Sequence, residues 1–121
     1  MGTVPRGHKG QEVDDGDWDW DEKRDIDAIV EALGWRGVAD AHAWYEGGSR
    51  PPELKQAYKL PHHTLRRGEL ALSRRGVKRA MAALNGARGG TDLPNADRRR
   101  VYNHLKAHYK ELGEDPPEFK E

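Results

Sequence analysis

The sequence contains no cysteine, and it has one phenylalanine and two methionines among its 121 residues. Without cysteine the chain has no disulfides, no thiolate metal ligands and no cysteine nucleophile. It also lacks a long hydrophobic run, and no stretch approaches the roughly 20 apolar residues of a membrane span. The segment from Met1 to Gly10 has no apolar core of the kind that a secretion signal carries. We therefore expect no membrane segment, and a protein used in the cytoplasm or carried inside a particle assembled there.

Charged residues are abundant and unevenly distributed. Lys and Arg number 21, as do Asp and Glu, so the formal net charge is zero. Residues 11–34 nevertheless hold ten acidic and two basic residues, whereas residues 66–110 hold twelve basic and three acidic residues. This asymmetry leaves two interpretations. The two halves pair within the molecule, or the basic half faces an anionic partner.

The length predicts one domain, because two cores in so short a chain would each bury too little apolar surface. Residues 1–17 combine glycine, proline and charged residues without periodicity. That composition predicts a disordered arm. Residues 18–121 are predicted to form a single small α+β domain.

A periodic run of Ile26, Ile29, Val30 and Leu33 predicts an amphipathic helix over residues 20–33, with this apolar face in the core. Acidic residues at its start suit the positive end of the helix dipole. The glycine that follows supplies a C-terminal stop.

The rest of the chain predicts a small antiparallel sheet and then two helices. Residues 57–65 are expected to be extended, and Gly68 suits a hairpin turn that returns the chain through residues 70–72. Ser73 is a good N-cap for the next helix, and glycine-rich residues 86–90 separate it from the last one. The predicted fold is therefore α+β, with an acidic N-terminal helix, a small antiparallel β-sheet and a C-terminal two-helix hairpin.

A series of short motifs runs in order from residue 43 to residue 119. They are Ala43-Trp44-Tyr45, Ala57-Tyr58-Lys59-Leu60-Pro61-His62-His63, Gly68-Glu69-Leu70, Arg75-Gly76-Val77, Ala80-Met81-Ala82-Ala83-Leu84, Gly86-Ala87-Arg88-Gly89-Gly90, Leu93-Pro94, Ala96-Asp97-Arg98, Val101-Tyr102-Asn103-His104-Leu105, His108-Tyr109 and Pro116-Pro117-Glu118-Phe119. This series resembles a module of tailed bacteriophages and prophages, found in or beside head proteins such as head maturation proteases and capsid-associated chains. The resemblance implies a place in the cytoplasm or within a phage particle, and it implies no mechanism.

Four histidines are the candidates for metal binding: His62, His63, His104 and His108. The last two stand four residues apart on one predicted helix, and histidines so spaced can reach one metal. However, the chain has no HExxH arrangement and no cysteine, and His108 lies on the predicted apolar stripe. The sequence therefore favours neither a metal nor a cofactor, and a hydrogen-bonded core histidine is the simpler interpretation.

Basic residues gather in the C-terminal half, where they predict contacts to phosphates or to another anionic partner. We call the following residues the basic belt: Arg66, Arg67, Arg74, Arg75, Lys78, Arg79, Arg88, Arg98 and Arg99.

No pattern predicts a catalytic site, because the closely spaced acids lie in or next to the predicted arm and Ser73 is explained as a cap. We therefore expect a non-catalytic interaction module of the phage type. Its partner would be a protein, either a phage structural protein or another copy of the chain, during head assembly or maturation. The alternative is a nucleic-acid-binding domain that uses the basic belt.

Overall fold

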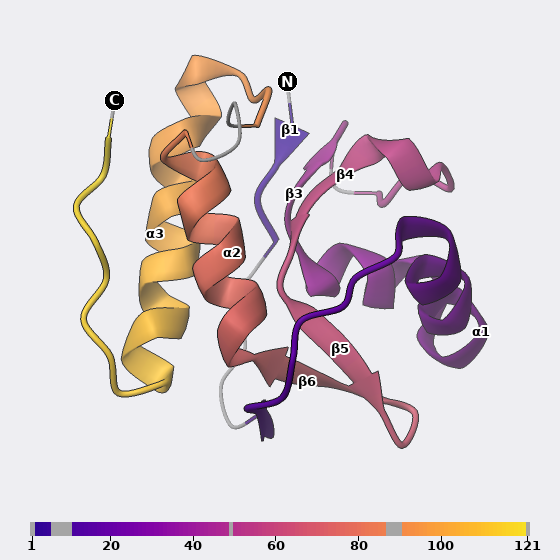
Figure 1. Cartoon of the computed structure of the whole chain (residues 1–121). Coiled ribbons are helices and arrows are strands. Elements are labelled where there is room, and N and C mark those ends of the chain that lie inside the picture. The colour runs from indigo at the N-terminus through magenta and orange to yellow at the C-terminus, as the bar shows by residue number, and fades with distance from the viewer. Residues whose placement is uncertain (1, 6–10, 49, 87–90, 121) are drawn as a thin grey trace.

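Figure 1 shows the structure, a computed structural model that describes residues 2–5, 11–48, 50–86 and 91–120. In chain order its elements are β1 (Gly2–Thr3), β2 (Val13–Asp14), α1 (Glu22–Ala41), β3 (His42–Glu46), the 3-10 helix η1 (Lys55–Ala57), β4 (Tyr58–Pro61), β5 (His63–Arg66), β6 (Glu69–Ser73), α2 (Arg74–Leu84) and α3 (Asn95–Glu111). This order confirms the predicted α+β class.

Helix α1 begins where the sequence predicts a helix but continues beyond the predicted end. The Asp21 side chain accepts a hydrogen bond from the backbone N–H of Arg24 at 2.8 Å and caps the first turn. Gly34 interrupts the helix with φ 74° and ψ −176°, and a second helical stretch then runs to Ala41. The prediction of Leu33 as a core residue is wrong, because its side chain at this break is 39% exposed.

The described strands form two three-stranded sheets with the orders β1-β3-β4 and β2-β6-β5. All pairings are antiparallel except β2 with β6, which is parallel. The segment predicted to be extended over residues 57–65 divides between the two sheets at His62. The backbone N–H of His62 donates to Ala41 O at 2.9 Å, and its carbonyl accepts from the N–H of Ser73 at 3.0 Å. The small antiparallel sheet of the prediction is therefore two small sheets joined at this residue.

The predicted hairpin and the predicted Ser73 cap are confirmed. Arg67 and Gly68 join β5 to β6 with φ values of 54° and 79°, the left-handed pair that a tight hairpin turn requires. The Ser73 hydroxyl accepts a hydrogen bond from the backbone N–H of Gly76 at 3.0 Å and starts α2. Helices α2 and α3 then pack side by side over β3 and β4, and Leu72, Leu84 and Leu105 lie in the core beneath them.

The segment predicted to be a disordered arm, residues 1–17, contributes two short strands. Strand β1 pairs with β3, and β2 pairs with β6. Backbone pairing and ion pairs, described below, account for this difference from the prediction, since neither depends on hydrophobic periodicity. Residues 6–10 lie outside the described part of the chain.

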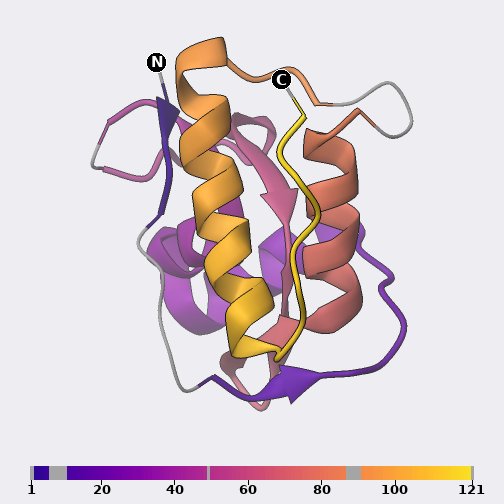
Figure 2. The same ribbon diagram turned by 90° about the vertical axis from the view of Figure 1, so that its left-hand side faces the viewer.

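The C-terminal segment runs along the helical layer between α2 and α3 (Figure 2). The Tyr102 hydroxyl donates to Pro117 O at 2.7 Å, and the ring of Phe119 packs on the ring of Tyr102 with centroids 5.2 Å apart. The C-terminal end of the domain therefore packs on its helical layer, whereas the N-terminal segment joins the two sheets.

Candidate functional sites: a histidine cluster and the basic belt

Four buried histidines meet between the sheets and α3, and we call them the histidine cluster: His62, His63, His104 and His108. His62 occupies the junction of β4 and β5, and His63 is the first residue of β5. The other two stand one turn apart on α3, so their side chains share one helix face. The exposed fractions are 0%, 0%, 8% and 1% in chain order.

The four rings form one contact cluster, in which His62 and His108 each contact the other three. His62 lies at the centre, with ring centroids 4.5 Å from His63, 5.3 Å from His104 and 4.8 Å from His108. One ring nitrogen from each of His62, His63 and His108 lies within 4.8 Å of the other two. The Nε2 atoms of His62 and His104 are 3.3 Å apart. Among the described residues, His62, His63 and His108 are the one group of three such side chains placed to hold a metal ion.

Oxygen acceptors at the edge of the cluster orient three of the rings. His62 Nδ1 lies 3.0 Å from Leu60 O, His63 Nε2 lies 3.0 Å from Gln11 Oε1, and His108 Nδ1 lies 2.9 Å from Glu111 Oε1. Each of these ring nitrogens donates its hydrogen to the oxygen, which places the lone pair of a neutral imidazole on the other nitrogen. The sequence indicated the histidines of this cluster but not the oxygen acceptors beside them. Glu111 was detectable by its i+3 spacing from His108, but nothing in the sequence points to Gln11.

Burial keeps the central histidine neutral. Desolvation lowers the pKa of His62 well below its usual value, and the positive charges that His63, His108 and His104 would carry lower it further. A neutral ring offers a lone pair, so this environment favours ligation or hydrogen bonding over a cationic role.

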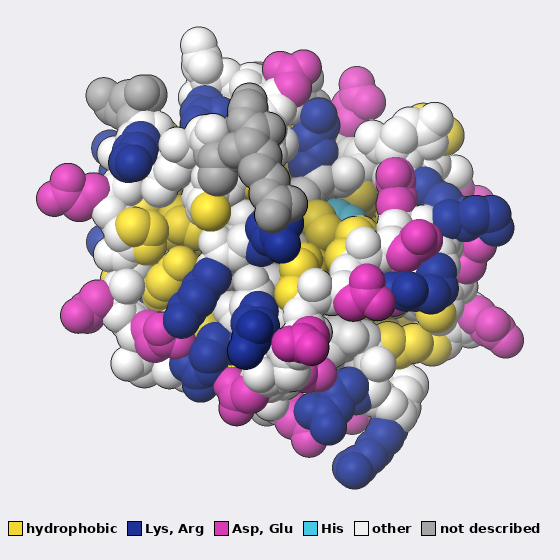
Figure 3. All heavy atoms as spheres, in the orientation of Figure 1, with side chains coloured by type: hydrophobic (Ala, Val, Ile, Leu, Met, Phe, Trp, Pro, Cys, Tyr) yellow, Lys and Arg dark blue, Asp and Glu magenta, His cyan; other side chains and the backbone are white. Residues whose placement is uncertain are grey.

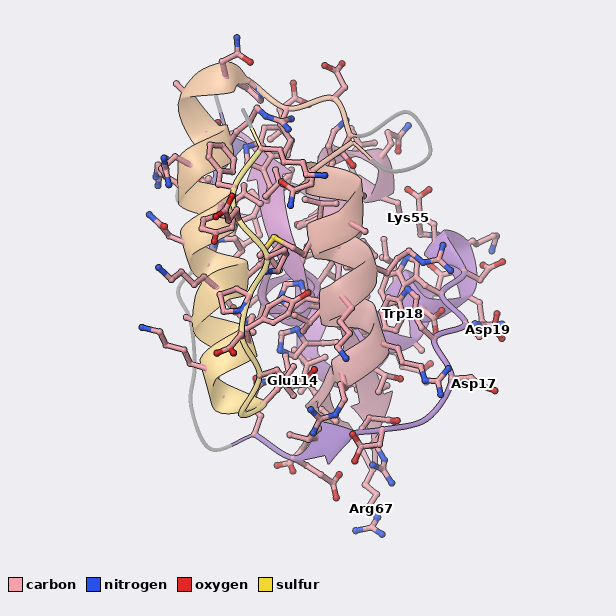
Figure 4. All side chains as sticks on the ribbon, turned by 60° about the vertical axis from the view of Figure 1, so that its left-hand side comes forward. Asp17, Trp18, Asp19, Lys55, Arg67 and Glu114 are labelled. Atoms are coloured by element: carbon pink, nitrogen blue, oxygen red, sulfur yellow. The ribbon has the colours of Figure 1, made fainter. Side chains whose placement is uncertain are left out.

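The basic belt is divided by the structure instead of forming one surface. Arg66 and Arg67 lie at the end of the β5–β6 hairpin, the next four residues lie on α2, and Arg98 and Arg99 lie on α3. Arg88 lies outside the described residues. Arg67 extends from the hairpin away from the body of the domain (Figure 4). Two members are engaged near the C-terminal helix: Arg98 donates to Leu84 O, and Arg99 lies over the ring of Phe119 at 4.6 Å.

An acidic segment lies against the rest of the belt, and we call residues 11–19 the acidic strap. The backbone N–H of Leu72 donates to Glu12 O at 2.8 Å, which fixes the strap beside β6. The side chain of Asp15 then accepts from Arg74 Nε at 2.6 Å, and Asp17 lies 3.6 Å from Arg75. Further ion pairs join Arg66 to Glu12 at 3.6 Å and to Asp14 at 3.9 Å.

The start of the C-terminal segment adds a second acidic contact to Arg74 and a first one to Lys78. Glu114 forms ion pairs with Arg74 and with Lys78, the latter at 2.8 Å. Figure 4 shows Asp17, Trp18 and Asp19 on one side of the N-terminal end of α2 and Glu114 on the other. Pairing within the molecule, the first of the two interpretations of the charge asymmetry, therefore accounts for four belt residues: Arg66, Arg74, Arg75 and Lys78.

Where the hairpin meets α1, the surface is hollowed into a groove of about 710 Å³. Its apolar lining consists of Leu33, Leu70 and Ala71, and its charged lining consists of Glu12, Asp40, Arg66, Arg67 and Glu69, with Gln11. Lysine and arginine side chains are interspersed with acidic ones across the face drawn in Figure 3. The sequence did not predict this groove, because it depends on the break at Gly34 that leaves Leu33 outside the core.

No protein-family model, curated protein or solved structure matches this chain. Among the described residues, no helix has the length and apolar character needed to cross a membrane.

Proposed function

We propose that this chain is a non-catalytic domain that binds a protein partner through the groove between the β5–β6 hairpin and α1. The observation that carries the proposal is the composition of that groove, whose lining combines apolar residues with charges of both signs. Protein interfaces combine a small apolar centre with a polar rim in this way. A partner that fits presents an apolar side chain flanked by charges of both signs.

Two features of the groove support a binding role over catalysis. Leu33 is one of two large hydrophobic residues in the described chain with a substantially exposed side chain, at 39% against 50% for Leu54. The described residues that line the groove include no serine, threonine, cysteine or histidine. Its lining therefore offers mainly apolar contact and ion pairing.

The acidic strap argues against the alternative, a nucleic-acid-binding domain. A nucleic-acid site needs several cations that release counterions when phosphates approach. In the basic belt, Arg66, Arg74, Arg75 and Lys78 already face carboxylates of the same chain. A phosphate backbone would have to displace these acids before it reached the arginines.

The resemblance to phage head-associated modules supplies the context of the proposal. The partner would then be a phage structural protein, bound during head assembly or maturation. This part of the proposal rests on the motifs quoted above and has no support from the geometry of the groove.

Site-specific photocrosslinking tests the groove directly. A photoreactive phenylalanine analogue replaces Leu33 in one variant and Leu54, the exposed control, in another. In cells that carry the natural gene, we expect a nuclease-resistant, protease-sensitive adduct from position 33 that Arg67→Glu abolishes, and no such adduct from position 54. Equal adducts at both positions, or none at position 33, contradict the proposal. An adduct of twice the chain mass would identify the partner as a second copy.

A titration against labelled duplex and single-stranded DNA tests the alternative. We expect no saturable binding at about 50 or 200 mM salt, because Arg66, Arg74, Arg75 and Lys78 already face carboxylates of the same chain. Binding at the lower salt that collapses at the higher one, and that Arg79→Glu weakens, would favour the nucleic-acid-binding domain.

A further inference from the structure

We propose that the histidine cluster is a structural zinc site, in which His62, His63, His104 and His108 ligate one Zn²⁺ and tie the β4–β5 junction to α3. The site is separate from the groove, and the inference does not rest on the proposed function. It revises the expectation from the sequence that favoured no metal.

Convergence of ring nitrogens is the first argument. Tetrahedral zinc with Zn–N distances of about 2.0–2.1 Å holds its ligand atoms roughly 3.3 to 3.4 Å from one another. The Nε2 atoms of His62 and His104, which share a hydrogen bond in which His62 accepts, already lie 3.3 Å apart. The nitrogens of His62, His63 and His108 lie within 4.8 Å of one another, so small side-chain rotations bring them to ligation distance.

The hydrogen bonds at the edge of the cluster are the second argument. A metal-ligating histidine characteristically donates its other ring N–H to a carbonyl or carboxylate oxygen, which fixes the tautomer and the ring orientation. Three residues of the cluster have such acceptors: Leu60 O for His62, Gln11 Oε1 for His63 and Glu111 Oε1 for His108. The lone pairs of these three rings therefore belong to the nitrogens that remain, as ligation requires.

The donor set selects the metal. Four neutral imidazoles suit Zn²⁺ and its neighbours Co²⁺, Ni²⁺ and Cu²⁺, whereas Mg²⁺ and Ca²⁺ require oxygen ligands. The carboxylate of Glu111, next to His108, partly offsets the charge of the bound ion. Because all four histidines are buried, the site would be closed to substrate, which is the arrangement of a structural zinc and not of a catalytic one.

Zinc at this place would hold together parts of the chain that few other contacts join. His62 lies at the junction between the two sheets, His63 comes from β5, and His104 and His108 come from α3. Gln11 extends the link to the acidic strap. Since the unfolded chain does not hold these histidines together, the free energy of metal binding becomes folding stability.

Metal titration of the full chain tests the proposal. After dialysis against a chelator, we expect one equivalent of Zn²⁺ to bind with submicromolar affinity and to raise Tm by on the order of 10 °C when free zinc is about 100 times Kd. Co²⁺ in place of zinc should give the intense visible absorption of a tetrahedral site. Binding weaker than micromolar, an octahedral cobalt spectrum or an unchanged Tm would overturn the proposal.

Matched variants locate the metal among the six histidines of the chain. His8→Asn and His42→Gln change the two histidines outside the cluster and should leave the zinc stoichiometry and cobalt spectrum unchanged. His104→Gln and His108→Gln should lower zinc affinity at least 100-fold. Circular dichroism shows whether each metal-free variant folds. If either variant does not fold, the cobalt spectrum of the unaltered chain tests the proposal instead. Retention of full affinity by both cluster variants would refute the assignment.

Discussion

The histidine cluster and the basic belt show how differently two groups of polar residues can behave in one small domain. The belt is conspicuous in the sequence, yet four of its members lie against acids of the same chain. The histidines are few, yet four of the six come together in the interior with exposed fractions of 8% or less. Charge density in a sequence therefore says little about an open binding surface, because the opposite charge elsewhere in the chain is free to cover it.

The two regions also differ in how much their contacts contribute to the free energy of folding. Exposed ion pairs contribute little, because water screens them and because two long side chains lose conformational freedom. Buried polar rings are costly to desolvate and must be satisfied by specific neighbours. We therefore expect substitutions in the cluster to have large effects and substitutions in the belt to have small ones.

Truncation of His62 gives the largest expected effect. In metal-free protein, His62→Ala removes a fully buried ring that contacts the three other histidines, and we expect a loss of about 2–4 kcal/mol in the free energy of unfolding. Urea denaturation with chelator present measures it, and Arg79→Ala on the exposed side of α2 is the control. A loss below about 1 kcal/mol would mean that the interior adapts to the missing ring, and the contrast with the belt would disappear.

Acid should destabilise the domain through another buried histidine, His42. Its Nδ1 donates to Val38 O at 2.8 Å, and burial lowers its pKa from 6.5 to about 4. Between these values the unfolded chain binds a proton that the folded chain does not, so stability falls as the pH falls from 6.5 towards 4. The expected contribution is about 3 kcal/mol.

Urea denaturation as a function of pH measures this contribution. His42→Phe keeps a ring beside Trp20 and Tyr58 but does not titrate, so its stability should fall less steeply over the same pH range. Identical slopes for the two proteins would assign the acid sensitivity to other groups.

Asp97 is a buried acidic residue whose substitution should also destabilise the domain. Its carboxylate accepts hydrogen bonds from Trp44 Nε1 at 3.0 Å and from the backbone N–H of Gly2 at 3.2 Å. The first of these contacts is the main cause of the lowered pKa of Asp97. Asp97→Ala leaves the buried indole N–H without its acceptor, and we expect a loss of about 1–3 kcal/mol.

Asp97→Asn keeps an acceptor at the same place and separates the loss of a hydrogen bond from the loss of charge. It should recover most of the stability, as measured by thermal and urea denaturation. Equal losses for the alanine and asparagine variants would show that the charge, and not the acceptor, is what matters.

Local patterns in the sequence predicted most of the fold. Helical spacing, the Ser73 cap and the glycine of the hairpin turn each depend on neighbours in the chain, and the structure bears them out. The second stretch of α1 was missed, because the sequence predicted that the helix ends at Gly34. In the structure Gly34 is a break of one residue, after which the chain is helical again. The parallel pairing of β2 with β6 was missed because it joins two-residue strands that carry no periodic signal.

The candidate sites were less predictable, because they depend on contacts far apart in the sequence. The i, i+4 spacing of His104 and His108 indicated one side of the cluster, but nothing local brings His62 to that helix. The neutralisation of Arg74 depends on Asp15, which is 59 residues away. The groove was not predicted, because the sequence placed Leu33 in the core, whereas its side chain is 39% exposed beside the break at Gly34.

Arg74 is the belt residue for which we expect a measurable effect. Its guanidinium contacts Asp15 and Glu114, and it also donates to Leu112 O at 3.2 Å. Arg74→Ala should lower Tm by a few degrees at low salt, and the difference from the unaltered chain should shrink at about 1 M salt because the ion pairs are screened. A difference independent of salt would assign the effect to the backbone contact instead.

The pair formed by Arg75 and Asp17 should have the smallest effect of all. The two side chains are 3.6 Å apart with exposed fractions of 63% and 94%, so water screens the attraction almost completely. In a double-mutant cycle with Arg75→Ala and Asp17→Ala, we expect a coupling energy below about 0.5 kcal/mol. A coupling above about 1 kcal/mol would mean that the acidic strap is held to α2 by its charges. In that case the strap, and not the interior, would be the better place to look for what controls access to the belt.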